Sequence, residues 1–190
     1  MIRYLREPSG WQAGKALFLD RDGVLNRRVI DGYITEEAEL ELIDVALDAA
    51  RLAQSRGLQI VIVTNQGAIG RELLQEWQLL RIHATLIEQL EGQGIQIAAL
   101  YACPHHPLAV KSSLRTCVCR KPAPGLLLQA QKDLAISMSH SLMIGDQPSD
   151  QMAAVAAGIS DAQTLTVTEG DAPHAVEAWV ATTLDGLSSN

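Results

Sequence analysis

The sequence predicts an α/β fold built on a doubly wound parallel sheet, and three observations support this. Short apolar segments of strand length alternate with longer segments of helical spacing from residue 16 to about residue 168. The short segments show little polar alternation, which is typical of strands covered on both faces. Acidic, hydroxyl or amide side chains follow the ends of several of them. We therefore expect right-handed crossovers and a ligand site at the carboxyl edge of the sheet.

The composition is that of one folded domain without a membrane segment. The chain has 190 residues, of which 47% are hydrophobic and 19% charged, and this excludes a disordered protein. No apolar run reaches the roughly 20 residues needed to cross a bilayer, and residues 1–15 lack the apolar core of a signal peptide. The formal net charge of −7 argues against general nucleic-acid binding. We expect a cytoplasmic monomer that binds neither nucleic acid nor membranes.

Three segments are expected along the chain. Residues 1–15 contain a Pro-Ser-Gly run and no clear periodicity, which predicts an N-terminal arm on the surface. Residues 16–170 form the expected domain. Residues 171–190 are predicted to be a C-terminal tail with a weak helix near residues 176–181.

The alternating segments define the expected elements in order. Strands are predicted over residues 16–19, 58–63, 97–102, 142–144 and 164–167. Helices are predicted over residues 44–56, 72–91, 124–134 and 149–157, with Gly57 suited to the end of the first and Pro124 to the first turn of the third.

The longest predicted helix carries one apolar stripe that we expect to face the core. Its members are Leu73, Trp77, Leu80, Ala84 and Ile87. We interpret His83, beside this stripe, as a packed or solvated side chain and not as a ligand.

The first predicted strand ends in an acid pair, Asp20 and Asp22, followed by Gly23. Both carboxylates would face the crevice at the sheet edge, because Gly23 allows a sharp turn there. Aspartate is also common in turns and at helix starts, so a capping role is the alternative.

Polar side chains also end later strands. Thr64, Asn65 and Gln66 follow the second strand, and Asp146 follows the fourth. The Thr64 hydroxyl could contact an oxyanion or a phosphate, although threonine and asparagine also end strands for turn reasons alone. We expect all these side chains at one edge of the sheet.

These residues suit phosphoryl transfer. Mg²⁺ prefers carboxylate and phosphate oxygens, and Asp20 and Asp146 fit that role. An aspartate can attack phosphorus to form an aspartyl-phosphate, while a second carboxyl, Asp22, protonates the leaving oxygen and later activates water. Thr64 and Lys121 would bind phosphoryl oxygens. The pattern offers a candidate for each part of a phosphatase site.

All three cysteines of the chain are close together in sequence. Cys103-x-His105 and Cys117-x-Cys119 offer three thiolates and an imidazole, a ligand set typical of closed structural Zn²⁺ sites. His106 could replace His105. Buried cysteines that act as small apolar side chains are the alternative.

The predicted zinc loop, residues 103–119, leads directly into Arg120 and Lys121. Zinc would thereby position a cationic clamp for an anionic substrate. A solvated basic pair is the alternative, and it is less favoured because Pro122 follows.

The ordered motifs resemble those of the haloacid dehalogenase superfamily. They are Leu19-Asp20-Arg21-Asp22-Gly23-Val24, then Thr64, then Lys121-Pro122, then Gly145-Asp146 with Asp150. The resemblance implies a Rossmann-like fold, with Asp20 as nucleophile and Asp22 as general acid/base. It also implies that Mg²⁺ is held by Asp20, the backbone carbonyl of Asp22, and Asp146. Asp150 would support Lys121 or the metal site.

A narrower set of motifs resembles two families, the D-glycero-D-manno-heptose 1,7-bisphosphate 7-phosphatases and the histidinol-phosphate phosphatases. The set comprises Asp20-Arg21-Asp22-Gly23 with Asn26, Gly32-Tyr33, Thr64-Asn65-Gln66, Cys103-Pro104-His105-His106-Pro107 and Cys117-Val118-Cys119-Arg120-Lys121-Pro122. This resemblance implies removal of the 7-phosphate of the heptose bisphosphate. Histidinol phosphate or another small sugar phosphate is the alternative substrate. The resemblance favours His105 as the zinc ligand, and it implies substrate contacts by Arg120, Asn65, Gln66, Asp31, Gly32 and Tyr33.

The chain departs from the heptose pattern in three places. Gln147 stands where a lysine commonly follows the motif aspartate, and Val24 replaces the usual threonine. The segment after the acid pair is slightly longer and carries Arg27 and Arg28. Our hypothesis is that one of these arginines binds the distal phosphate and compensates for Gln147.

No segment is long enough to form a separate cap domain. We therefore expect an open crevice, bordered by residues 30–33 and the predicted zinc loop, that admits a small sugar phosphate. A zinc-stabilised binding module without catalysis is an alternative of another class. It is disfavoured because a binding module does not require a nucleophile paired with an acid.

Overall fold

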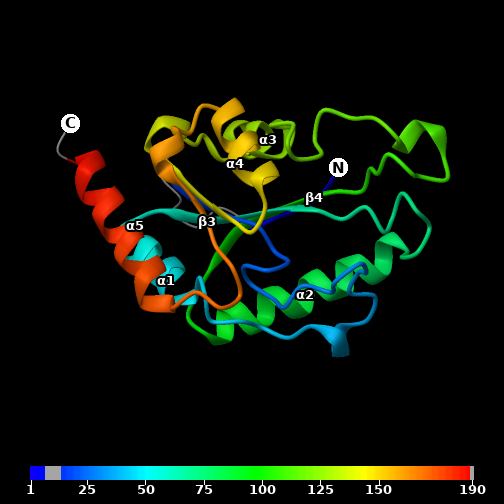
Figure 1. Ribbon diagram of the computed structural model, residues 1–190, viewed down its shortest axis with the longest axis horizontal. Coiled ribbons are helices and arrows are strands. Elements are labelled where there is room, and N and C mark those ends of the chain that lie inside the picture. Colours follow the sequence, from blue (N-terminus) through cyan, green and yellow to red (C-terminus); the bar gives the residue numbers. More distant parts are fainter. Residues whose placement is uncertain (7–13, 189–190) are drawn as a thin grey trace.

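The sheet has the predicted α/β architecture. The computed structural model describes residues 1–6 and 14–188. Six strands pair in the order β1-β4-β3-β2-β5-β6 (Figure 1). The strands are β1 (Ile2–Leu5), β2 (Ala16–Leu19), β3 (Gln59–Asn65), β4 (Ile97–Cys103), β5 (Leu142–Gly145) and β6 (Thr164–Thr166). β1 is antiparallel to β4, and the other neighbouring pairs are parallel.

Helices cover both faces of the sheet. They are α1 (Leu47–Ser55), α2 (Glu76–Gly92), α3 (Gly125–Leu134), α4 (Pro148–Ala156) and α5 (Pro173–Ser188). Short 3-10 turns lie at η1 (Glu37–Glu39), η2 (Ser112–Leu114), η3 (Met138–His140) and η4 (Asp161–Gln163). α1, α2 and α5 lie on one face of the sheet, and α3 and α4 lie on the other (Figure 1). No helix among the described residues is long and apolar enough to cross a membrane.

Strand alternation sorts the core into two layers. Leu17 and Leu19 of β2 pack with the buried side chains of α1, α2 and α5, whereas Phe18 packs with those of α3 and α4. Successive side chains of a strand point to opposite faces, so a strand that is apolar throughout serves both layers. This explains why the predicted strands show no polar alternation.

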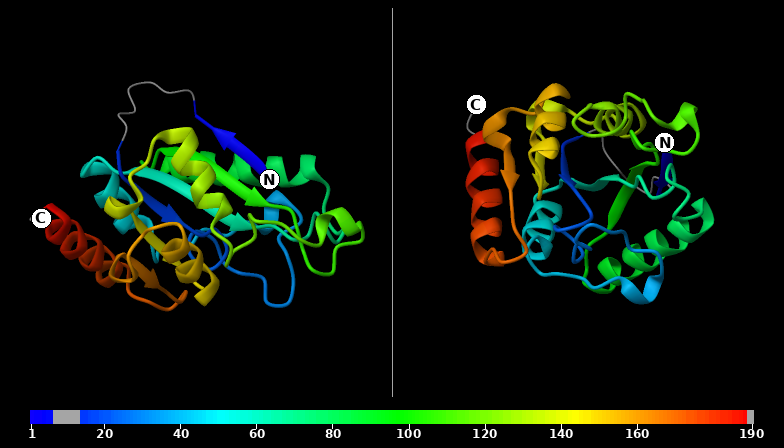
Figure 2. Two further views of the ribbon diagram at one scale, coloured as in Figure 1. Left: turned by 90° about the horizontal axis from the view of Figure 1, so that it is seen from above. Right: turned by 45° about the vertical axis from the view of Figure 1, so that its right-hand side comes forward.

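The described parts of the predicted arm and tail contain regular structure that packs against the sheet and α1. Residues 2–5, expected to lie on the surface, pair with β4 as an edge strand, while residues 7–13 of the predicted arm lie outside the described residues. The weak helix expected near residues 176–181 is the middle of α5, which buries Val176 and Val180 and lies beside α1 (Figures 1 and 2). At the opposite edge of the sheet, β6 is only partly buried, although it was expected to be a core strand.

The predicted helix over residues 72–91 begins later, at Glu76, and four of the five residues predicted to face the core do not, of which Leu73 precedes α2. Trp77 is 59% exposed, and Leu73, Leu80 and Ala84 are also exposed. The buried face instead comprises Leu79, Ile82, His83, Leu86, Ile87 and Leu90. This face carries five Leu and Ile side chains at helical spacing, whereas the predicted stripe contains Ala84 and begins before α2, so the less continuous of two apolar stripes was chosen.

His83 is the buried polar member of that face and is 3% exposed. Burial, reinforced by the positive charge of Arg21, lowers the pKa of His83 from 6.5 to about 3, against a smaller opposing effect of Asp22. The imidazole is therefore neutral in the folded protein. Of the two alternatives predicted for His83, packed or solvated, the structure shows the packed one.

The neutral His83 makes stability depend on pH. The unfolded chain protonates this imidazole below pH 6.5 and the folded chain does not until about pH 3, so stability is lost as the pH falls through this window. Between pH 7.5 and pH 5 the loss from this residue should be about 2 kcal/mol. In urea unfolding, the free energy of unfolding of His83→Leu should therefore fall by about 2 kcal/mol less than that of the parent between pH 7.5 and pH 5. His174→Ala, at an exposed position, is the control and should behave as the parent; equal pH dependence in both variants would contradict this assignment.

Candidate active site

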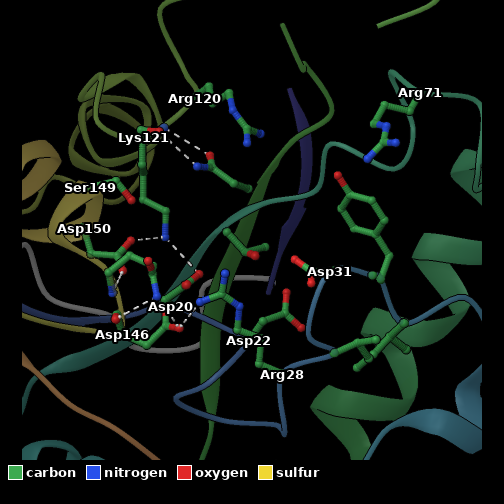
Figure 3. A pocket seen from close by; sticks show the side chains of 17 residues that line it. Asp20, Asp22, Arg28, Asp31, Arg71, Arg120, Lys121, Asp146, Ser149 and Asp150 are labelled. Atoms are coloured by element: carbon green, nitrogen blue, oxygen red, sulfur yellow. Dashed lines mark hydrogen bonds and ion pairs between the residues drawn. The ribbon is translucent and has the colours of Figure 1, made fainter. Parts of the chain in front are cut away.

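The predicted catalytic side chains meet in one pocket of about 420 Å³ at the carboxyl ends of the strands (Figure 3). Asp20 and Asp22 follow β2, Thr64 is the penultimate residue of β3, and Asp146 follows β5. Lys121 reaches the same place from the loop before α3. All five residues line the pocket, as expected for the edge of a doubly wound sheet.

A buried ion-pair triad forms the floor of the pocket. The Lys121 Nζ lies 2.9 Å from Asp20 Oδ1 and 2.6 Å from Asp150 Oδ1, and it donates to the Val63 carbonyl at 2.7 Å. The lysine side chain is 1% exposed. Burial alone would lower the pKa of Lys121, but the charges of Asp20 and Asp150 outweigh burial and raise it, so the ammonium stays protonated. Asp150 supports Lys121, as the motif resemblance implied.

The pKa of the Asp20 carboxyl is raised. Burial raises its pKa to about 6, while the charge of Lys121 opposes that shift and the carboxylates of Asp150 and Asp22 add to it. The Lys121 ammonium thus keeps a buried carboxyl available as a carboxylate above about pH 6. A nucleophilic aspartate requires this ionised form.

Asp22 lies in a contrasting environment. Arg21 Nη2 donates to both of its oxygens at 2.8 and 2.9 Å, Asn26 Nδ2 donates to Oδ1 at 3.0 Å and Gln66 Nε2 to Oδ2 at 2.9 Å. Burial raises the pKa of Asp22, but the Arg21 charge and these hydrogen bonds outweigh burial, so the net pKa is lowered. Gln66 Nε2 also lies 2.9 Å from Thr64 Oγ1. Two carboxyls with opposite pKa shifts in one pocket can perform different tasks.

The backbone of Lys121 is held from β3. Asn65 Nδ2 donates to the Lys121 carbonyl at 3.0 Å, and the Lys121 amide donates to Asn65 Oδ1 at 3.1 Å. Asn65 also lines the pocket, whereas Gln66 is 1% exposed and lies beneath Asp22. Both were predicted as substrate contacts, and their hydrogen bonds favour positioning roles.

Three carboxylates are close enough to share a cation. One oxygen each from Asp20, Asp146 and Asp150 lies within 4.8 Å of the others. Gly23 makes the approach possible, since its φ is 85° and a Cβ there would lie 2.7 Å from Asp146 Oδ2. This all-oxygen donor set suits a hard divalent cation such as Mg²⁺. The pKa of Asp146 is raised, mainly by burial. The hydrogen bond from Gln147 and the charge of Arg28 lower it, and the charge of Asp20 raises it further.

The loop after β2 forms one wall of the pocket. Asp31, Gly32 and Tyr33 line it, as predicted for substrate contacts, and so does Arg28. Arg27 does not line it. Of the two arginines in our hypothesis, the structure therefore brings only Arg28 to the site.

Sequence reasoning missed several residues of the site. Arg71 lines the pocket and lies 5.9 Å from the Tyr33 ring centroid, over its face. Ser149 also lines the pocket. Arg21, a motif residue to which we gave no role, is 1% exposed and holds Asp22. Arg21 could have been predicted as a site residue, because it stands between the two motif aspartates. Arg71 belongs to none of the motifs, so the sequence did not indicate it.

The four predicted zinc ligands form one cluster. Cys119 Sγ lies 3.2 Å from Cys103 Sγ and 3.4 Å from His105 Nδ1, and Cys103 Sγ lies 3.7 Å from Cys117 Sγ. All four ligand atoms fall within 4.8 Å of one another. A zinc tetrahedron with thiolate arms of about 2.3 Å has sulfur–sulfur edges of about 3.8 Å, so the donor set and spacing fit Zn²⁺. His105, and not His106, belongs to this cluster.

The cluster is coupled to Arg120. The Arg120 amide donates to Cys117 Sγ at 3.3 Å, and its Nη1 donates to the His105 carbonyl at 3.0 Å. Arg120 lines the pocket together with Lys121. Whatever fixes the cysteine cluster therefore also fixes both cations of the predicted clamp.

Comparison with known proteins shows the family. The HAD-hydrolase-like family model matches residues 118–187. A D-glycero-beta-D-manno-heptose-1,7-bisphosphate 7-phosphatase from Yersinia pestis is 43% identical over 149 residues, which are 78% of each chain. The chain belongs to this phosphatase family. The Escherichia coli K12 member is 38% identical over 175 residues, covering 90% of this chain and 91% of its own.

Solved structures agree with this assignment. A D,D-heptose 1,7-bisphosphate phosphatase from B. bronchiseptica, complexed with magnesium and phosphate, gives a TM-score of 0.72 at 27% identity and covers 93% of this chain and 99% of its own. A HAD-like phosphatase from Mesorhizobium loti gives 0.81 at 29% identity, over 90% and 86% of the two chains. The protein is a phosphoric monoester hydrolase, as the motifs predicted. The alternative of a non-catalytic binding module is not supported.

The cluster geometry predicts bound zinc. Purified protein should contain about one zinc per chain by atomic absorption, because three thiols and an imidazole converge on one point. His105→Ala should lose most of this zinc and lower the melting temperature, since a closed site needs its fourth ligand.

His106→Ala is the matched control. Its Nδ1 accepts a hydrogen bond from the Leu108 amide at 3.0 Å and lies outside the cluster, so this variant should keep its zinc. Zinc-free parent protein, or equal zinc loss in both variants, would contradict the assignment.

Proposed function

We propose that the protein is a Mg²⁺-dependent phosphatase that removes the 7-phosphate from D-glycero-D-manno-heptose 1,7-bisphosphate through an aspartyl-phosphate on Asp20. The observation that carries this proposal is the buried triad of Asp20, Lys121 and Asp150, with Asp22 and Asp146 beside it in one pocket. The choice of heptose bisphosphate as substrate is supported by the Yersinia pestis and Escherichia coli relatives, which are both named 7-phosphatases of this compound.

The first half of the reaction transfers the phosphoryl group. A carboxylate oxygen of Asp20 attacks phosphorus, and the bond to the sugar oxygen breaks. Asp22, in its protonated form, gives a proton to that oxygen, which leaves as the sugar hydroxyl. Lys121 and the Thr64 hydroxyl stabilise the equatorial oxygens as charge develops.

The second half returns Asp20 to its starting state. Water attacks the phosphorus of the aspartyl-phosphate and gives a proton to the Asp22 carboxylate, and inorganic phosphate leaves. The lowered pKa of Asp22 keeps this carboxyl ionised in the free protein, so it is in the form that can accept a proton in this half. Binding of the substrate dianion would favour the protonated form needed in the first half.

Asp20, Asp146 and the backbone carbonyl of Asp22 would hold Mg²⁺, as the motif resemblance implies. When bound, the ion supplies charge neutralisation for the phosphate and for the clustered carboxylates. Cys103, His105, Cys117 and Cys119 would hold a structural zinc that fixes Arg120 and Lys121.

The pocket also suits a substrate with two anionic groups. Arg71 and Arg120 line it in addition to Lys121, and in Figure 3 both lie toward the side away from Asp146. A sugar bisphosphate that places its reacting phosphate at Asp20 could place its second phosphate near these arginines. Histidinol phosphate has one phosphate and a cationic amine, and it would leave this positive charge unmatched.

A substrate panel tests the proposal. We expect kcat/KM to be highest for a heptose 1,7-bisphosphate when both anomers, histidinol phosphate and fructose 1,6-bisphosphate are assayed with Mg²⁺. Release of the 7-phosphate should be established by ³¹P NMR of the product. A preference for histidinol phosphate, or release of the 1-phosphate, would contradict the proposed function.

Trapping tests the covalent intermediate. Acid quenching during turnover should leave one phosphoryl group on the peptide containing Asp20, detected by mass spectrometry. Asp20→Asn should lose both the label and about 10³-fold or more of kcat, because it removes the nucleophile. Asp48→Asn changes an exposed aspartate on α1 and should retain both. A fully active Asp20→Asn variant would exclude this mechanism.

A further inference from the structure

The floor of the pocket carries more negative than positive charge. Four carboxylates gather there, namely Asp20, Asp22, Asp146 and Asp150, and two buried cations, Arg21 and Lys121, pair with three of them. The divalent cation of the proposed function would neutralise the remainder. The dianion of a phosphate monoester would then again leave the site negative. A further cation close to the reacting group would therefore stabilise phosphoryl transfer.

Arg28 is in the right place to supply that charge. Its Nη1 lies 3.0 Å from Asp146 Oδ2, and the side chain is 50% exposed and lines the pocket. Figure 3 shows its guanidinium beside Asp20 and Asp22 at the floor. The carboxylate that it contacts lies within 4.8 Å of a carboxylate oxygen of Asp20.

The oxygen that Arg28 contacts is shared. Gln147 Nε2 also donates to Asp146 Oδ2 at 3.0 Å, so this oxygen already accepts two hydrogen bonds. A divalent cation bound to Asp146 would compete directly with the positively charged guanidinium. Gln147 is neutral and cannot take over its charge.

The backbone of Arg28 is anchored independently of its side chain. Glu169 accepts the Arg28 amide at 2.7 Å and Arg27 Nη1 at 2.8 Å, and Arg27 also pairs with Glu41 at 2.8 Å. Among the described residues, Asp146 is the acid with which the Arg28 guanidinium pairs. The loop therefore holds the arginine at the pocket while its long side chain can change partner.

We propose that Arg28 is a catalytic arginine that exchanges partners. It pairs with Asp146 as the structure shows, and when a divalent cation occupies that carboxylate it donates instead to nonbridging oxygens of the phosphoryl group at Asp20. This deepens the proposed function but rests only on phosphoryl transfer to Asp20, not on the identity of the sugar. This assignment differs from our hypothesis of a distal-phosphate contact for one of the two arginines, and the tests below distinguish the two.

The first test measures the metal alone. Titration calorimetry with Mg²⁺ should show Arg28→Gln binding the ion about three- to tenfold more tightly than the parent, because no guanidinium has to be displaced from Asp146. Arg56→Gln is the matched control: it removes an equally exposed guanidinium from a 3.0 Å pair with Asp185, away from the pocket, and should bind as the parent. Unchanged or weaker binding by Arg28→Gln would overturn the exchange.

The second test measures the phosphoryl contact. With saturating Mg²⁺, Arg28→Gln should bind inorganic phosphate at least tenfold more weakly than the parent, and kcat/KM for p-nitrophenyl phosphate should fall about 100-fold. Arg28→Lys should recover part of both losses, because it restores the charge without the planar fork. Arg56→Gln should change neither.

The outcomes separate this inference from the proposed function. A loss confined to bisphosphate substrates, with phosphate binding and p-nitrophenyl phosphate unaffected, would overturn the inference and return Arg28 to a distal contact. If no heptose bisphosphate is hydrolysed but Arg28→Gln weakens phosphate binding and tightens Mg²⁺ binding, the substrate proposal fails and the role of Arg28 stands.

Discussion

The site depends on a lysine ammonium buried between two carboxylates. Burying a charge is strongly unfavourable unless it is paired and hydrogen-bonded, and Lys121 satisfies this with Asp20, Asp150 and the Val63 carbonyl. The same contacts align the strand ends of β2 and β3 with the start of α4. Removing Lys121 would leave two carboxylates in the core without their countercharge, so the geometry of the pocket and the stability of this edge of the sheet are coupled.

A second constraint reaches the pocket from the cysteine cluster. The loop between β4 and α3 is polar and has little regular structure, yet it must deliver Arg120 and Lys121 to fixed positions. Four ligand side chains drawn together at its base, with the Arg120 amide bonded to Cys117, restrict that loop without a large apolar core. One short segment thus contains both the cysteine cluster and two cations that line the pocket.

The sequence predicted the chemistry better than the packing. Asp20, Thr64 and Asp146 each end a strand, and parallel strands bring such residues together whatever the details of packing. The buried face of α2 was predicted wrongly, because Trp77 and Leu80 form a second apolar stripe beside the more continuous one of Leu79, Ile82, Leu86 and Leu90, and contact with the sheet decides between them. The pairing of β1 with β4 was also missed, since it joins residues almost 100 positions apart and has no local signal.

The edge strand β1 also protects the sheet. β4 is buried along its whole length, and one of its hydrogen-bonding edges pairs with the four residues of β1 and with the Arg6 amide, which donates to the Ala98 carbonyl; ion pairs from Arg3 to Asp133 and from Arg6 to Glu91 reinforce this pairing. A protein shortened to begin near Ala16 would keep every pocket residue but would present an apolar strand with open amide and carbonyl groups. Such an edge can recruit strands from other molecules, so the cost of that truncation would be self-association and poor solubility rather than a direct loss of chemistry.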